Sequence, residues 1–358
     1  MRDIVRIGWL LGPWLLLAGC SGGTMPVGDG GAAVTQQIVF MQPAGSDAVP
    51  GGDAVFEIAI MNLDGSGLRQ LTNDGKQKFL PHFSPDATQL VYTKFSVGGY
   101  GSPNAQADVV VYDFASGGEI QLTHSGKGFQ PAWSPDGRRI VYNTMGDSLH
   151  VMNADGSDDH LVIKPNGTQD EQVFGDTAWS SDDWILFAVA QNTNDCFKVR
   201  LDKIRPDGTE RTQVTDGGPS CTPKAAEQSG DADPGFSSDG QTIYSSRGFP
   251  EPPAGIPAWG DPAPDMTAPF PTERKLFAFS SDAWYPGKPE MDLSLPSEPS
   301  CIEGVPKGSP DRRRILLYRI CFNSGMPKGG IYVTDTAGSY RTLVTQGFGP
   351  DWNPLASQ

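Results

Sequence analysis

A short phrase built around Ser and Asp recurs along this 358-residue chain and constrains its fold more than any other feature. Each full copy is followed by an apolar run, such as Leu90 to Tyr92, that is typical of a β-strand. Repeats of roughly 40–50 residues predict a solenoid or a propeller. The five copies contain Ser84 and Asp86, Ser134 and Asp136, Ser180 and Asp182, Ser237 and Asp239, and Ser309 and Asp311, and Pro350 to Asn353 resembles a truncated sixth.

Each unit is predicted to hold four antiparallel strands, A to D. Strand A carries the residue pair aromatic-Ser, and strand B is the apolar run after the Pro-Asp-Gly turn. Strand C is a second apolar run, such as Val109 to Tyr112, and a second turn leads to strand D, which ends in a pair such as Leu71-Thr72. Short β-rich runs separated by Asp-Gly turns indicate hairpins throughout.

The two ends of the chain carry complementary parts of one unit. Residues 37–41, 56–61 and 69–72 supply strands B, C and D, whereas the chain ends on a strand A near Trp352. Pairing the termini closes one ring and removes exposed sheet edges. We therefore predict an all-β, six-bladed propeller of four-stranded antiparallel blades over residues 36–354, with the N-terminal strands completing the last blade.

The turn Trp133 to Gly137, the Asp-Gly-Ser turns and the closing Leu-Thr pairs resemble the PD40 (WD40-like) repeats of TolB-type six-bladed propellers. The resemblance covers about Gln37 to Pro354. It is strong in the first two complete units and poorest in the fifth, where Gly308 replaces the aromatic residue. TolB proteins also have an N-terminal α/β domain, which this chain is expected to lack. The role of TolB in the Tol-Pal system is therefore not carried over.

Residues 1–19 are predicted to be a lipoprotein signal peptide. Arg2 and Arg6 precede an apolar stretch too short to span a bilayer, and the residues before Cys20 resemble a bacterial lipobox. By that resemblance, Cys20 is diacylated, and two acyl chains suffice for stable anchoring. An ordinary signal peptide is the alternative. Ser21 favours the outer membrane, and the Gly-rich residues 20–35 are predicted to form a flexible tether.

The net charge of −15 disfavours a nucleic-acid partner. Four further cysteines in an exported chain imply disulfides, and their proximity suggests Cys196 with Cys221 and Cys301 with Cys321, although three connectivities are open. Their spacing is not that of a metal site, and we expect no metal or other cofactor. The acidic stretches 192–195 and 231–233 leave Ca²⁺ as an alternative, although neither matches a full calcium loop.

The strand order places the A–B and C–D turns on one face and every long connection on the other. The long connections are residues 43–54, 96–107, 164–176, 216–233, 247–274 and 285–305, and all four cysteines fall on the same face. Loops held by a rigid scaffold commonly carry function, so we predict a binding face here. The alternative is tolerated drift in surface loops. The proline-rich segment 247–274 is predicted to be either a recognition arm presenting Trp259 and Phe270 or an ordered lid.

The propeller axis is a second candidate. The residue before the aromatic position of strand A is small in three units and polar in the other three, where it is His82, Lys307 or Asp351. These three fall on consecutive blades, so we predict one polar cluster, either a ligand site or a satisfied ion pair. The repeated aspartates of the turns are predicted to make local hydrogen bonds to backbone N–H groups.

These features favour a lipid-anchored binding module of the bacterial envelope, which recognises a protein, peptide or glycan on the face of the B–C and D–A loops. An envelope glycan lyase or hydrolase acting at the channel mouth and a purely structural envelope component are the alternatives. The G-x-S-x-G pattern at residues 19–23 crosses the lipobox, and no hydrolase domain is expected. We assign no catalytic residue and disfavour an enzyme.

Overall fold

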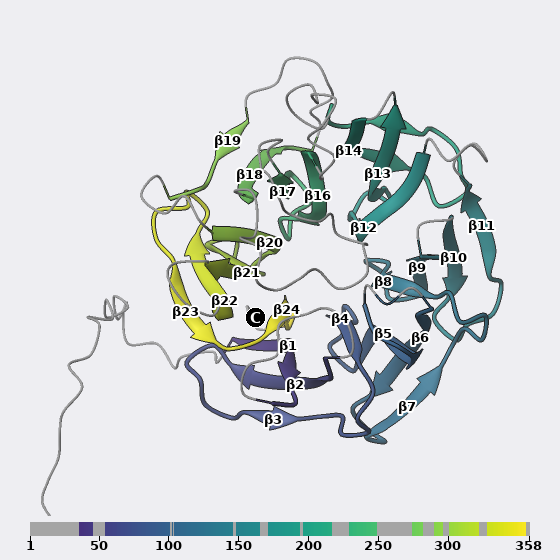
Figure 1. Cartoon of the computed structure of the whole chain (residues 1–358), viewed down its shortest axis with the longest axis vertical. Helices are drawn as coiled ribbons and strands as arrows, with labels where there is room; N and C mark the ends of the chain where they lie inside the picture. The colour runs from purple at the N-terminus through teal and green to yellow at the C-terminus, as the bar shows by residue number, and fades with distance from the viewer. Residues whose placement is uncertain are drawn as a thin grey trace, which may run out of the picture. The chain divides into compact units, whose positions relative to one another are not determined.

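The computed structural model describes residues 36–45, 54–100, 102, 104–145, 148–164, 171–193, 196–216, 229–248, 274–281, 290–295, 301–321 and 328–355. These residues form strands and turns but no helix, and their four-stranded antiparallel blades surround a central axis (Figure 1). The prediction of an all-β, six-bladed propeller is confirmed. Among the described residues, no helix is long and apolar enough to cross a membrane.

The blades follow one another along the chain, each from its innermost to its outermost strand. Blade 1 holds β4 (Lys78–Phe83), β5 (Gln89–Val97), β6 (Gln106–Asp113) and β7 (Gly118–Gln121). Blade 2 holds β8 (Phe129–Trp133), β9 (Arg139–Asn143), β10 (Leu149–Asn153) and β11 (His160–Ile163). Blade 3 holds β12 (Glu171–Trp179), β13 (Ile185–Thr193), β14 (Cys196–Ile204) and β15 (Thr212–Gln213).

The remaining blades bring the chain back to its start. Blade 4 holds β16 (Ser229–Phe236), β17 (Thr242–Gly248), β18 (Arg274–Ser280) and β19 (Met291–Asp292). Blade 5 holds β20 (Cys301–Gly308), β21 (Arg314–Cys321), β22 (Lys328–Asp335) and β23 (Thr342–Thr345). Blade 6 joins β24 (Phe348–Trp352) to β1 (Gln37–Pro43), β2 (Phe56–Asn62) and β3 (Arg69–Gln70).

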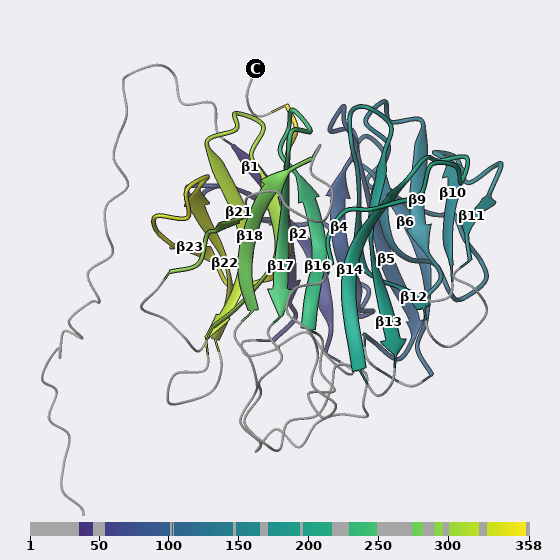
Figure 2. The same cartoon turned by 90° about the horizontal axis from the view of Figure 1, so that it is seen from above.

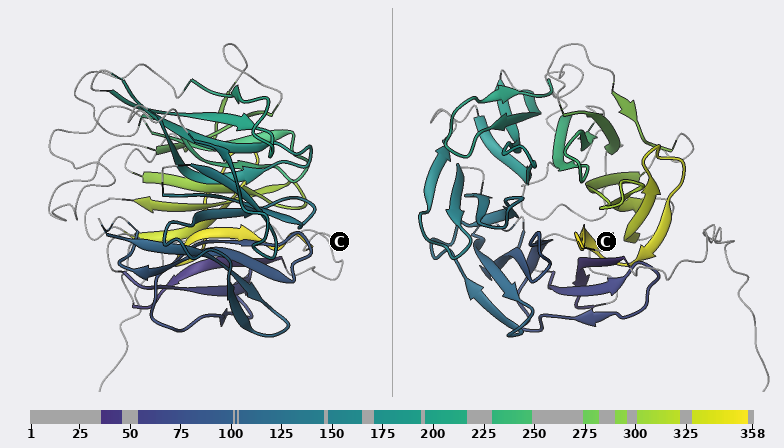
Figure 3. Two further views of the ribbon diagram at one scale, coloured as in Figure 1. Left: turned by 90° about the vertical axis from the view of Figure 1, so that its right-hand side faces the viewer. Right: turned by 180° about the vertical axis from the view of Figure 1, so that it is seen from behind.

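Blade 6 closes the ring as the sequence predicts. Strand β24 pairs antiparallel with β1, so that Trp352 lies opposite Ile38 and Asp351 opposite Val39. Figures 1 and 3 show the two differently coloured ends of the chain side by side in this blade. Two further strand pairings join neighbouring blades elsewhere in the ring. Parallel contacts between β14 and β16 and between β18 and β20 join blades 3, 4 and 5 into one continuous sheet.

The recurring Ser and Asp form the turn between strands A and B. The Ser84 hydroxyl donates to Asp86 Oδ1 at 2.6 Å, and the same carboxylate oxygen accepts the backbone N–H of Thr88. The equivalent serine–aspartate bond is also 2.6 Å long in blades 2, 3 and 4. The prediction that the repeated aspartates accept local backbone N–H groups is confirmed for Asp86, Asp136, Asp239 and Asp311. Hydrogen bonding inside the turn also lowers the pKa of Asp86.

The closing Leu-Thr pair also has a structural role. The Thr123 hydroxyl accepts the backbone N–H of Val109 at 2.9 Å and donates to Asp108 Oδ1 at 2.9 Å. Thr72 makes the same two bonds in blade 6, to Ile58 and Glu57. The threonine therefore fastens the end of strand D to the start of strand C in its own blade.

Antiparallel connectivity gives the ring two different faces. The A–B and C–D turns lie on one, which we call the turn face, and the B–C and D–A connections lie on the other, the loop face. Figure 2 shows the strands from the side, running between the two faces. Apolar side chains fill the space between blades: Val91, Val109 and Val111 of blade 1 pack with Trp133 and Ile140 of blade 2.

Candidate functional site

Every innermost strand contains a β-bulge at which one residue has a positive φ angle. The residue is Leu80, Gln130, Gly175, Asp233, Val305 or Gly349 in blades 1 to 6. In five blades it is followed by proline, which has no N–H to donate to a ladder and suits a bulge. In blade 3 it is followed by Asp176. A carboxylate therefore stands near the axis where the other blades carry a proline ring.

Asp176 is the hub of an ionic group that we call the axial cluster: His82, Asp176, Lys307 and Asp351. Its Oδ2 atom lies 2.8 Å from Lys307 Nζ, and its Oδ1 atom lies 3.5 Å from His82 Nε2. His82 Nδ1 lies 3.5 Å from Asp351 Oδ2, which also accepts the backbone N–H of Phe83 at 3.1 Å. The three residues predicted from the sequence therefore lie together, and with Asp176 they connect blades 1, 3, 5 and 6.

Asp176 and His82 of the axial cluster are buried, Lys307 and Asp351 are partly buried, and the four charges stabilise one another. Asp176 is fully buried and His82 is 6% exposed. Burial opposes the charge on Asp176, but Lys307 and His82 outweigh it and lower the pKa of this carboxyl. For His82, burial and the charge of Lys307 favour the neutral ring, yet the carboxylates of Asp176 and Asp351 raise its pKa overall. For Lys307, the same two carboxylates overcome burial and raise its pKa.

Apolar side chains of the inner strands gather on the loop-face side of the axial cluster. The innermost strands all run from the loop face to the turn face, so residues early in each strand lie nearer the loops. One buried apolar group contains Phe79, Val305 and Phe348, each of which precedes the axial-cluster residue of its own strand. Phe129 of blade 2 belongs to the same apolar group. The arrangement fits an ionic tie between blades. The ligand-binding role predicted for His82, Lys307 and Asp351 stays a prediction.

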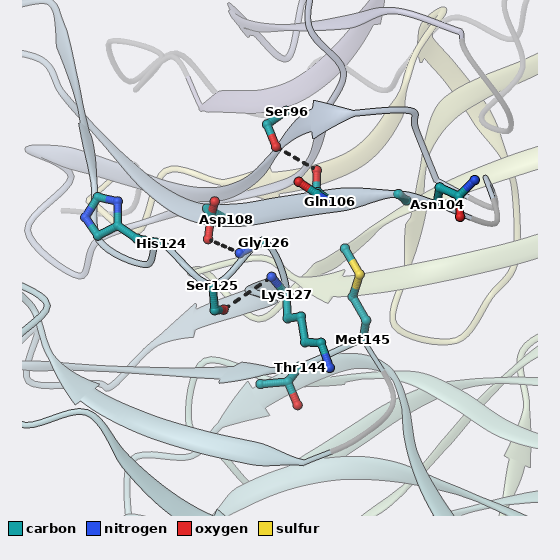
Figure 4. A pocket seen from close by; sticks show the side chains of 11 residues that line it. Ser96, Asn104, Gln106, Asp108, His124, Ser125, Gly126, Lys127, Thr144 and Met145 are labelled. Carbon is teal, nitrogen blue, oxygen red and sulfur yellow. Dashed lines mark hydrogen bonds between the residues drawn. The ribbon is translucent and has the colours of Figure 1, made fainter.

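A cleft of about 620 Å³ opens on the loop face between blades 1 and 2. Blade 1 contributes Ser96 and residues 104–106 around its B–C connection, and Asp108 of β6. The D–A connection between the blades contributes residues 124–127, and the B–C connection of blade 2 contributes Thr144 and Met145. Figure 4 shows these side chains around the opening, with Lys127 extending toward Thr144. The sequence predicts a binding face here but does not locate this cleft.

The neighbouring blade junction differs from this one at the residue before the first phenylalanine of the inner strand. Between blades 6 and 1, the residue before Phe79 is Lys78, which is fully buried and pairs with Glu57 at 2.7 Å. Between blades 1 and 2, the corresponding residue before Phe129 is Gly128. A Cβ atom on Gly128 would lie 2.5 Å from Thr123 Oγ1, so a side chain has no room there. The buried lysine of one junction therefore has no counterpart at the other.

One predicted disulfide is present. Cys301 and Cys321 lie opposite each other in the β20–β21 pair and are bonded, with an S–S distance of 2.06 Å. Cys20, Cys221, Trp259 and Phe270 lie outside the described residues. Lipidation, the pairing of Cys196 with Cys221 and the recognition arm therefore stay predictions.

Within the described part of the chain, no group of three or more His, Cys, Asp or Glu side chains is placed to hold a metal ion. The acidic stretch 231–233 has other partners: Asp231 pairs with Arg247 at 2.7 Å, and Asp233 accepts the hydroxyl of Ser246 at 3.2 Å. Residues 194 and 195 lie outside the described residues, so a Ca²⁺ site at 192–195 stays a prediction.

Comparison with known proteins agrees with the repeat motif and the ring. The chain is 30% identical over 114 residues to the TolB homolog of Chlorobaculum tepidum, which covers 31% of this chain. It is 28% identical over 141 residues, 37% of this chain, to an uncharacterised peptidase, YuxL, of Bacillus subtilis. The aligned stretches span 25% and 20% of the length of these relatives. No protein-family model matches the chain.

Solved structures show the same fold at low identity. TolB of Acinetobacter baumannii superposes with a TM-score of 0.59 at 15% identity, over 90% of this chain and 67% of that one. A putative TolB of Agrobacterium tumefaciens gives 0.53 at 12% identity, over 91% of this chain and 100% of that one. The described residues form a TolB-like six-bladed β-propeller.

Proposed function

We propose that this protein is a lipid-anchored binding module of the bacterial envelope, whose partner docks at the cleft on the loop face. The observation that carries the proposal is the cleft itself. It lies among the B–C and D–A connections, where the sequence predicts a binding face. Its volume falls within the roughly 300–1,000 Å³ range of ligand sites. The likeness to TolB propellers supports an envelope protein that recognises a partner.

The walls of the cleft are held in place by the scaffold. Asp108 Oδ1 accepts the Thr123 hydroxyl at 2.9 Å and the backbone N–H of Gly126 at 3.1 Å, which fixes the D–A connection against β6. A pre-organised loop loses little conformational freedom when a partner binds. An enzyme at the channel mouth has less support, because the axial carboxylate of Asp176 is paired with Lys307 and that of Asp351 accepts a backbone N–H.

The anchor is tested by the variant Cys20→Ala. The proposal predicts that the wild-type chain incorporates labelled palmitate and fractionates with the outer membrane. The variant should carry no label and should be released from the membrane fraction. A wild-type chain that carries no lipid would contradict the anchor but would leave the docking proposal standing.

Docking is tested by capture of envelope components with two matched variants of blade 1. Ser125→Trp adds a large side chain at the edge of the cleft, whereas Ala115→Trp adds the same side chain to an exposed C–D turn on the turn face. We expect Ser125→Trp to lose partners that the wild type and Ala115→Trp retain. Equal capture by all three proteins would overturn the proposal. The double variant Trp259→Ala/Phe270→Ala tests in the same assay whether the predicted arm contributes.

A further inference from the structure

We propose that the cleft between blades 1 and 2 binds a neutral oligosaccharide. This inference rests on the proposed function and adds the chemical class of the ligand. It follows from the composition of the walls, from the way the scaffold orients them and from the charge of the site.

The walls of the cleft are rich in hydrogen-bonding groups and poor in apolar ones. Of the eleven lining residues, Ala105, Gly126 and Met145 are the only ones without a polar side chain. Most of the others carry hydroxyl, amide or imidazole groups, which donate and accept in the way that sugar hydroxyls require. Protein partners are more commonly anchored by buried aromatic or arginine side chains, and the lining of this cleft contains neither.

A second set of contacts orients His124 at the rim. The side-chain amide of Gln121 lies 2.8 Å from the Thr123 carbonyl oxygen, 3.1 Å from Asp108 Oδ2 and 3.2 Å from His124 Nδ1. The two hydrogens of this amide are accepted by the Thr123 carbonyl and by Asp108, and His124 Nδ1 lies beside the same nitrogen. The exposed His124 imidazole therefore lies at the rim of the cleft, where its ring nitrogens can hydrogen-bond a ligand hydroxyl.

The charge of the site favours a neutral ligand. Among the lining residues there is one carboxylate, Asp108, which already accepts three hydrogen bonds, and one lysine, Lys127. Two opposite charges give the cleft no net attraction for an anionic chain. The net charge of −15 on the whole protein repels anionic chains as well.

The test is ligand-observed NMR and calorimetry with four probes on the purified propeller-containing chain: maltotriose, N-acetylated chitotriose, trigalacturonate and an uncharged hexapeptide. We expect at least one of the two neutral trisaccharides to bind. The double variant Asn104→Ala/His124→Ala should lower its affinity about tenfold, since two ligand hydrogen bonds are lost. The matched variant Asn73→Ala, at the position equivalent to His124 in the junction filled by Lys78, should bind like the wild type.

Binding of neither neutral trisaccharide, or binding that Asn104→Ala/His124→Ala leaves unchanged, would overturn the inference. So would hexapeptide or trigalacturonate binding that the double variant abolishes while the neutral sugars do not bind. Circular dichroism checks that each variant is folded. Ser125→Trp, which adds a large side chain at the edge of the cleft, is a second variant that should weaken trisaccharide binding. If the sugars fail but Ser125→Trp still loses an envelope protein, the ligand class is wrong and the proposed docking face stands.

Discussion

Asp176 Oδ2 lies 2.8 Å from Lys307 Nζ and thereby joins the innermost strand of blade 3 to that of blade 5. Both groups are largely removed from solvent, and His82 and Asp351 extend the contact to blades 1 and 6. The ring of blades thus has an ionic tie at its centre in addition to the apolar packing between neighbouring blades. The tie makes the axis sensitive to single charge changes.

We expect Asp176→Asn to destabilise the protein by about 3–5 kcal/mol, because it removes the buried carboxylate that pairs with Lys307, whose side chain is only 12% exposed. Adding Lys307→Met should recover part of the loss by removing the lone charge. Urea unfolding followed by circular dichroism measures both changes. The exposed pair of Arg312 and Asp239 is the control: Arg312→Gln should cost about 0–1 kcal/mol. Equal effects at the two sites would show that the axial pair contributes no more than a surface pair.

His82 should make stability depend on pH in a definite direction. Its pKa is raised in the folded state, so the folded protein binds the proton more tightly than the unfolded chain, whose histidine titrates near about 6.5. The stabilisation is complete below that pH and is lost as pH rises through the higher folded pKa. We expect the free energy of unfolding to fall across this window and the fall to be absent in His82→Gln. A wild-type protein that instead gains stability across the window would contradict the sign.

The disulfide between Cys301 and Cys321 closes a loop with a sequence separation of 20 residues. In the chain-entropy model such a crosslink stabilises by about 3 kcal/mol. We therefore expect Cys301→Ser/Cys321→Ser to lower the free energy of unfolding by about 3 kcal/mol. Peptide mapping without reduction should recover the Cys301–Cys321 crosslink and shows in the same experiment whether Cys196 pairs with Cys221. Recovery of Cys301 joined to any other cysteine would refute the pairing.

Gly235 tests how closely the innermost strands approach each other. A Cβ atom at this position would lie 2.2 Å from the backbone oxygen of Pro306, in blade 5, so Gly235→Ala forces the two strands apart. We expect a loss of about 1–3 kcal/mol, the usual range for overpacking. At Gly45 an added Cβ meets nothing within 4 Å, and Gly45→Ala should be close to neutral. Tolerance of alanine at both positions would mean that the strands separate more easily than this contact implies.

The fold could be read from the sequence because its signals are local and repeated. Each Ser–Asp turn, such as Ser134 with Asp136, makes its bonds within a few residues and marks one blade. The missing strand A at one end and the surplus strand A at the other then determine how the ring closes. Cys301 and Cys321 could be paired because they flank a single hairpin.

The centre of the candidate site was harder to predict. Counting back one residue from the aromatic position selects Ala178 in blade 3 and misses Asp176. Asp176 takes the place of the proline that follows the bulge in the other five blades. It lies one residue further from the aromatic position than those prolines do, because blade 3 carries one extra residue, Thr177. The cleft left no local signal, because it is formed by three connections from two blades and depends on how those blades pack together.

Photo-crosslinking in intact cells tests the docking face most directly. Benzoylphenylalanine placed at Ser125, beside the cleft, should form adducts with an envelope partner, whereas the same probe at Ala115, on the turn face of the same blade, should not. Adducts from Ala115 with none from Ser125 would place the partner on the opposite face and contradict the account.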